Sequence, residues 1–80
     1  MLERDAIKSK VNEIVNHYAP IAEPEMDRPL TLRPYHMDAR ELTAVFLDME
    51  REFGVNLNKL FDEPIDFSID SLANAVSLQL

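Results

Sequence analysis

Clustered carboxylates are the residues of this chain whose types and spacing come closest to a chemical site. Four acids lie close together near the C-terminus: Asp62, Glu63, Asp66 and Asp70. Calcium prefers several oxygen ligands, often on a loop with a glycine at its sharp turn. This stretch contains Pro64 and no glycine. We therefore interpret it as a solvated acidic surface and predict no metal site.

The two histidines are the other candidates for chemistry. His17 and His36 are isolated in the sequence, and no serine with a plausible partner arrangement accompanies them. The chain has no cysteine, which excludes cysteine nucleophiles and thiolate metal sites. Paired acid–base catalysis needs a cleft, and a helical domain of 80 residues offers little cavity. We predict no catalytic residues and a non-enzymatic protein.

The composition indicates one small acidic domain spanning residues 1–80. A net charge of −7 disfavours nucleic acid and anionic membranes, whose phosphates attract Lys and Arg, and it favours basic protein surfaces. No apolar run approaches the ~20 residues of a membrane span. The first five residues lack the basic-then-apolar layout of a signal peptide. We predict a cytoplasmic monomer with no nucleic-acid or membrane partner.

Three amphipathic helices are predicted from the spacing of the apolar residues, over residues 3–18, 38–53 and 68–79. The expected buried stripe of the first consists of Ile7, Val11, Ile14, Val15 and Tyr18. That of the second consists of Leu42, Val45, Phe46, Met49 and Phe53. That of the third consists of Ile69, Leu72, Ala73 and Val76. These stripes predict that the three helices share one core.

Both ends of the second helix carry specific end signals. Asp38 can cap its start, and Glu41 at the third helical position completes a capping box. Met37 and Leu42 occupy the two ends of a hydrophobic staple. Gly54 stands where a left-handed C-terminal cap is expected. This helix is therefore the best defined of the three.

Two connections complete the predicted all-α fold. Residues 19–37 contain four prolines, which cannot sit in helix interiors. The second half of this loop is expected to pack onto the core through Leu30, Leu32, Tyr35 and Met37. Residues 55–67 are predicted to contain a short helical turn near Asn58–Phe61. The expected architecture is a bundle of four helical pieces: three main helices, this turn, and a long loop between the first and second helices.

The second helix also carries a family motif. Its ends read Met-Asp-Ala-Arg-Glu-Leu at residues 37–42 and Met-Glu-Arg-Glu-Phe-Gly-Val at residues 49–55. They resemble the second helix of acyl carrier proteins, which begins with Asp-Ser-Leu and closes with an acidic run, Phe and often Gly. Asp38 stands at the Asp position, Phe53 follows at the family's spacing, and Ala39 takes the place of the serine. The long first loop and the order of elements extend the resemblance over nearly the whole chain.

The resemblance implies that the usual attachment site is lost, because an alanine methyl has no oxygen to accept phosphopantetheine. We predict no cofactor; 4'-phosphopantetheine is expected only if position 39 is serine in the native gene. A literal Asp-Ser-Leu does occur at Asp70-Ser71-Leu72, but only eight residues follow it. The family's serine is followed by a full helix and two further helical pieces. We therefore interpret Ser71 as part of the start of the third helix.

The outer side of the second helix is the predicted partner-binding surface. At 100° per residue, Arg40, Ala44, Leu47 and Arg51 lie opposite the buried stripe. Carriers commonly present acids around an exposed hydrophobic residue here; Leu47 matches the hydrophobic residue, whereas the two arginines and Ala44 depart from that pattern. A solvated helix face with one stray leucine is the alternative. The docking face is defined as Asp38, Ala39, Arg40, Glu41, Ala44, Leu47 and Arg51.

The resemblance implies a non-enzymatic acyl carrier protein-like module. Such a module would dock on a biosynthetic or peptide-modifying enzyme without carrying phosphopantetheine. Two alternatives stay open. One is a genuine acyl or peptidyl carrier whose attachment serine has been replaced by Ala39. The other is an unrelated small helical adaptor or regulatory subunit.

Overall fold

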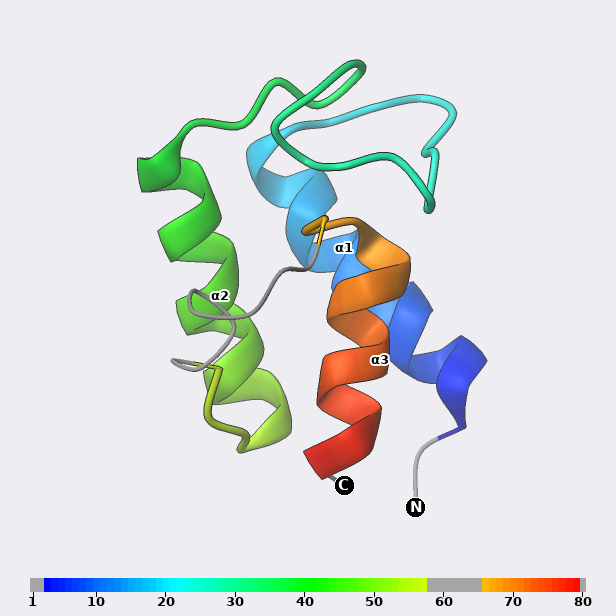
Figure 1. The fold of residues 1–80 in the computed structure, drawn as a ribbon, viewed down its shortest axis with the longest axis vertical. Helices are drawn as coiled ribbons and strands as arrows, with labels where there is room; N and C mark the ends of the chain where they lie inside the picture. The colour runs from blue at the N-terminus through cyan, green and yellow to red at the C-terminus, as the bar shows by residue number, and fades with distance from the viewer. Residues whose placement is uncertain (1–2, 58–65, 80) are drawn as a thin grey trace.

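Three helices and no strand make up the part of the chain that the computed structural model describes, residues 3–57 and 66–79 (Figure 1). They are α1 (Arg4–Tyr18), α2 (Ala39–Phe53) and α3 (Ile69–Gln79). The all-helical prediction is confirmed, and each boundary agrees to within one residue. The short helical turn expected at Asn58–Phe61 lies outside the described residues. Over the described residues, the observed fold is thus a compact three-helix structure, and the radius of gyration is 11.4 Å.

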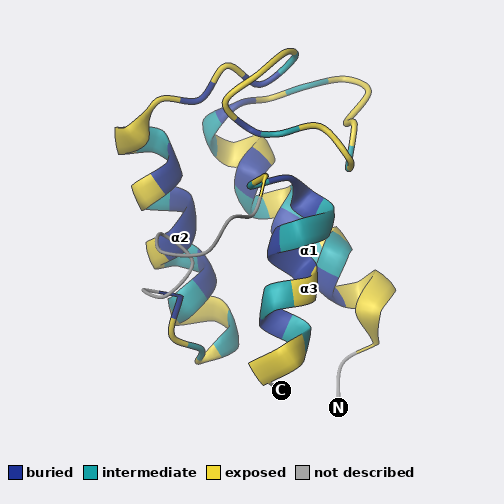
Figure 2. Cartoon of the chain, in the orientation of Figure 1, coloured by how far each residue is buried: buried dark blue, intermediate teal, exposed yellow. Residues whose placement is uncertain are grey.

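The helix stripes form one core, as Figure 2 shows by the buried residues that face inward. α1 packs against both α3 and α2 and is the central element. Two residues of the α1 stripe in the C-terminal half of the helix, Ile14 and Tyr18, are only partly buried. The α2 and α3 stripes are buried except for Phe53, which is partly buried. Phe46 also meets Phe67, with ring centroids 5.8 Å apart.

The end signals of the helices do what their residue types predict. Ser68 caps α3, because its Oγ accepts the Ser71 N–H at 3.1 Å. Gly54 ends α2 with φ 68° and ψ 33°, the left-handed conformation that glycine adopts without steric cost. Ala19 and Pro20 follow α1, where proline cannot continue the helix.

The long loop packs onto the core, with one exception. Leu30, Tyr35 and Met37 are buried as predicted. Leu32 is 55% exposed, so its predicted packing is wrong. The reason is local: the Leu32 N–H donates to the Pro29 carbonyl, and its own carbonyl accepts the Tyr35 N–H. Leu32 thus sits between two consecutive turns, and its side chain lies on the exposed side of the loop.

Backbone hydrogen bonds fasten this loop to the start of α3. The Leu30 N–H donates to the Phe67 carbonyl at 3.2 Å, and the Asp70 N–H donates to the Met26 carbonyl at 3.0 Å. The Leu30 carbonyl in turn accepts the N–H of Met37, just before α2, at 2.8 Å. Leu30 therefore links the start of α3 to the start of α2. Phe67 adopts a φ of 55° at this junction, which is unusual for a bulky residue.

Candidate docking face on α2

The start of α2 is fixed by the predicted capping box. Asp38 Oδ1 accepts the Glu41 N–H at 2.9 Å, and Glu41 Oε1 accepts the Asp38 N–H at 3.3 Å. Both carboxylates of the docking face are therefore engaged by the helix backbone. Ala39 is exposed as the first residue of α2, and its carbonyl accepts the Thr43 hydroxyl at 2.8 Å.

The outer ridge of α2 consists of Arg40, Ala44, Leu47 and Arg51. Leu47 is 52% exposed, both arginines are exposed, and Ala44 is half-buried. The helical phase predicted from sequence is thus correct, because the buried stripe occupies the opposite side. These observations describe which residues are accessible; a binding role for them stays a prediction.

Ion pairing within the fold is weak at Arg51 and is not seen at Arg40 among the described residues. Arg51 Nη1 lies 4.0 Å from Asp48 Oδ1, at the limit of an ion pair, and its side chain is 81% exposed. Within residues 3–57 and 66–79, no carboxylate lies at ion-pair distance from Arg40. The positive charge of the ridge is therefore available to a partner.

The side of α2 next to α1 is occupied by contacts between the helices. Lys10 Nζ lies 3.4 Å from Glu52 Oε1, and the Tyr18 hydroxyl donates to Asp48 Oδ2 at 2.5 Å. The Glu52 hydrogen bond raises the pKa of Lys10, and the Asp48 hydrogen bond raises that of Tyr18. These ties border a groove that also exposes part of Ile14. Sequence patterns missed this groove, because it depends on how two helices rotate against each other.

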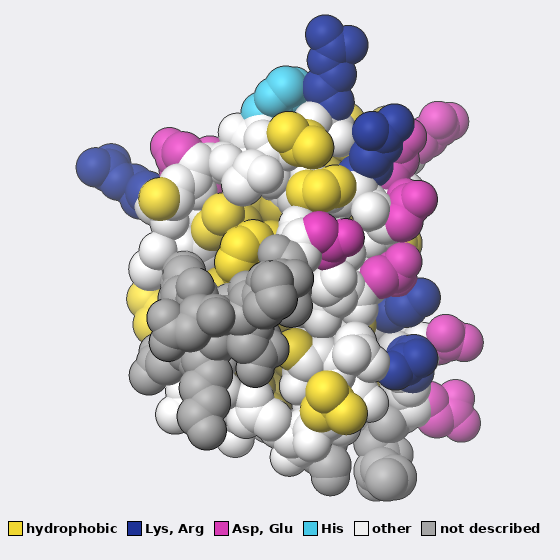
Figure 3. Space-filling view, in the orientation of Figure 1, with side chains coloured by type: hydrophobic (Ala, Val, Ile, Leu, Met, Phe, Trp, Pro, Cys, Tyr) yellow, Lys and Arg dark blue, Asp and Glu magenta, His cyan; other side chains and the backbone are white. Residues whose placement is uncertain are grey.

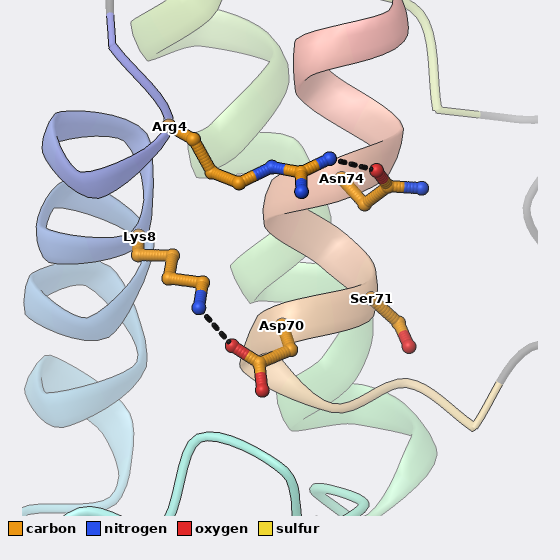
Figure 4. A pocket seen from close by; sticks show the side chains of 5 residues that line it. All are labelled: Arg4, Lys8, Asp70, Ser71 and Asn74. Atoms are coloured by element: carbon orange, nitrogen blue, oxygen red, sulfur yellow. Dashed lines mark hydrogen bonds and ion pairs between the residues drawn. The ribbon is translucent and has the colours of Figure 1, made fainter.

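A second polar groove lies between α1 and α3 (Figure 4). Arg4 reaches across it, and its Nη2 donates to Asn74 Oδ1 at 2.5 Å. Lys8 Nζ lies 2.7 Å from Asp70 Oδ1. This oxygen is buried and accepts no hydrogen bond from the described residues, so the ion pair with Lys8 offsets the cost of burying its charge. Figure 3 shows basic and acidic side chains interspersed along this side of the molecule. The cations of α1 are therefore used within the fold.

The serine, histidines and acidic cluster singled out in the sequence lie outside the docking face. Ser71 Oγ donates to Asp66 Oδ1 at 2.5 Å within the first turn region of α3. The His17 ring contacts the Tyr18 ring edge-on, with centroids 5.0 Å apart, and His36 is exposed in the loop with a φ of 50°. Asp62 and Glu63 of the acidic cluster lie outside the described residues.

In the described ranges, no three or more His, Asp or Glu side chains are arranged to hold a metal ion. No helix among the same residues is both long and apolar enough to cross a membrane.

Comparison with known proteins gave no match: no protein-family model matches the sequence, no curated protein matches it, and no solved structure matches its fold. The function is therefore inferred from the docking face and from the motif of α2.

Proposed function

We propose that this chain is a non-enzymatic acyl carrier protein-like module that docks on a biosynthetic or peptide-modifying enzyme through α2. It acts without phosphopantetheine, because Ala39 occupies the attachment position. The observation that carries the proposal is Leu47, a large apolar residue left 52% exposed on the side of α2 opposite the core. The resemblance of α2 to a carrier's second helix supplies the class of partner.

The exposed half of the Leu47 side chain contributes no burial free energy to folding. Full burial of a leucine side chain contributes about 1.5–3 kcal/mol, so covering the exposed half in a complex contributes roughly 1 kcal/mol. Arg40 and Arg51 flank this contact on the same ridge. Charges at the rim of an apolar contact set orientation and partner choice more than affinity. The docking face thus has the layout of a small protein-contact surface.

The decisive experiment replaces Leu47 by a charged residue. The partner is captured from the source organism with the unmodified protein, isolated, and titrated with Leu47→Asp. We expect at least a tenfold loss of affinity, about 1.4 kcal/mol, with helicity by circular dichroism nearly unchanged. Leu78→Asp is the matched control, because Leu78 is 80% exposed on α3, outside the docking face. Equal binding by Leu47→Asp and the wild type would remove α2 from the interface.

A second experiment tests the cofactor-free state. The protein is incubated with coenzyme A and a broad-specificity phosphopantetheinyl transferase, and its intact mass is measured. We expect no change in mass, because Ala39 offers no nucleophile. A mass gain mapped to Ser71 would instead assign attachment to the Asp-Ser-Leu of α3.

The Ala39→Ser variant tests the second candidate, a genuine carrier whose serine has been replaced. Ala39 is exposed at the first residue of a capped helix, where a serine hydroxyl is accessible to a transferase. Loading of Ala39→Ser would support retention of the carrier recognition surface. Failure of this variant to load, with its fold intact, would favour an unrelated helical adaptor.

A further inference from the structure

We propose, on the basis of the proposed function, that the partner surface that meets α2 is acidic: it presents carboxylates on both sides of an apolar contact for Leu47. The net charge of −7 suggests the opposite, a basic partner. The distribution of charge on the docking face decides between the two.

The charges that flank Leu47 along the outer ridge are positive. Its two carboxylates, Asp38 and Glu41, accept backbone N–H groups in the capping box. Its two cations remain available: Arg51 is 81% exposed with an ion pair of 4.0 Å, and Arg40 has no carboxylate at ion-pair distance among the described residues. A partner that covers Leu47 therefore meets a guanidinium group on each side of it, whereas the two carboxylates lie at one end of the face, each with one oxygen bonded to the helix backbone.

The other cations on the helices differ in this respect. Lys8 pairs with Asp70 at 2.7 Å, and Lys10 pairs with Glu52 at 3.4 Å. Arg4 donates to Asn74. These three cations of α1 thus interact with α2 or α3 within the fold, whereas the two arginines of the outer ridge of α2 are exposed. Because the Debye length is about 8 Å at physiological ionic strength, a docked partner responds to this local charge more than to the net charge.

The spacing on α2 defines what the partner presents. At 1.5 Å per residue, Arg40 lies about 10 Å along the axis from Leu47, and Arg51 lies about 6 Å on the other side. The complementary surface carries carboxylates at about these two offsets from an apolar socket, because guanidinium groups pair with planar carboxylates in a bidentate fashion. An apolar residue at the centre of the ridge favours a protein over a phosphate backbone, which offers leucine no apolar contact.

Two synthetic helical peptides test this charge preference. Each has about 20 residues, long enough for appreciable helicity, and an apolar stripe around one central leucine. The acidic peptide has glutamates four and seven residues on either side of that leucine, which covers both orientations on α2. The basic peptide has lysines at the same positions. Each is titrated into the ¹⁵N-labelled protein and followed by amide chemical shifts.

We expect the acidic peptide to shift the amides of Arg40, Leu47 and Arg51 and to bind at least fivefold more tightly than the basic peptide at low salt. The difference should shrink at high salt, because these charges are exposed. The double variant R40E/R51E should reverse the preference. The control R28E/R33E changes the net charge equally in the loop and should leave the preference unchanged.

The outcomes separate this inference from the proposed function. Equal or tighter binding of the basic peptide on the outer ridge would overturn the acidic partner while keeping α2 as the docking face. Absence of shifts on α2 with either peptide would overturn the acidic partner, and normal partner binding by Leu47→Asp would overturn the docking face itself. A single-stranded oligonucleotide that shifts the outer ridge more than the acidic peptide would replace a protein partner with a nucleic acid.

Discussion

At the scale of single residues, hydrogen bonds explain features that the sequence leaves ambiguous. Ser71 belongs to an Asp-Ser-Leu triplet, yet its hydroxyl is engaged by Asp66. The Asp66 carboxylate also accepts the Ser68 N–H at 3.1 Å. These hydrogen bonds lower the pKa of Asp66 below its ordinary value of 3.8, and the bond from Ser71 has the largest effect. The serine therefore helps to fix the start of α3.

Removal of this hydroxyl should change an acid titration. In Ser71→Ala, we expect the pKa of Asp66 to rise toward 3.8, as measured by NMR titration of its side-chain carboxyl. A lowered folded-state pKa contributes stability above 3.8 that is lost as the pH falls through the folded value. The variant should therefore lose less stability across that acid window. Ser9→Ala, at an exposed site on α1, is the control and should leave the pKa of Asp66 unchanged. An unchanged pKa of Asp66 in Ser71→Ala would contradict the assignment.

At the scale of elements, the end signals of α2 make the strongest case that local sequence specifies structure. The capping box at Asp38 and Glu41 and the left-handed Gly54 each depend on residues within one turn. Helical periodicity likewise placed the buried stripe and the exposed Leu47 on opposite sides. These features were predictable because each depends on neighbours a few residues away.

Gly54 offers a clean test of a backbone effect. A Cβ at this position would meet no atom within 4 Å, so an added methyl group causes no clash. We expect Gly54→Ala to lower the free energy of unfolding by about 1 kcal/mol, because its φ of 68° is left-handed. Gly54→Asn should cost less, since asparagine tolerates this region. Urea denaturation measures both; an alanine variant as stable as the wild type would show that the cap contributes little.

At the scale of the whole molecule, the sequence predicted the shared core and the burial of Leu30, but neither the side-chain pairs between helices nor the exposure of Leu32. The Lys10–Glu52 and Tyr18–Asp48 pairs depend on how α1 and α2 rotate against each other. The burial of Leu30 and the exposure of Leu32 depend on which backbone groups the loop meets near Phe67. Loop residues have no periodicity that reports their direction, so their placement follows from long-range packing alone.

The loop therefore acts as part of the core, and a matched pair of substitutions tests this. Leu30 is fully buried, whereas Leu32 is 55% exposed only two residues away. Leu30→Ala should lower the free energy of unfolding by about 2–5 kcal/mol, through lost burial and the cavity left behind. Leu32→Ala should change it by less than about 0.5 kcal/mol.

Chemical denaturation measures both variants, and amide chemical shifts locate the damage. Because the Leu30 backbone joins Phe67 to Met37, Leu30→Ala should perturb the starts of α3 and α2 together. The docking face begins at Asp38, one residue beyond this link. Equal destabilisation by the two substitutions would show that the loop packs differently. A large loss of stability in Leu30→Ala alone, with shifted amides at the starts of both α3 and α2, would support the view that the loop and α3 together position the start of the docking face.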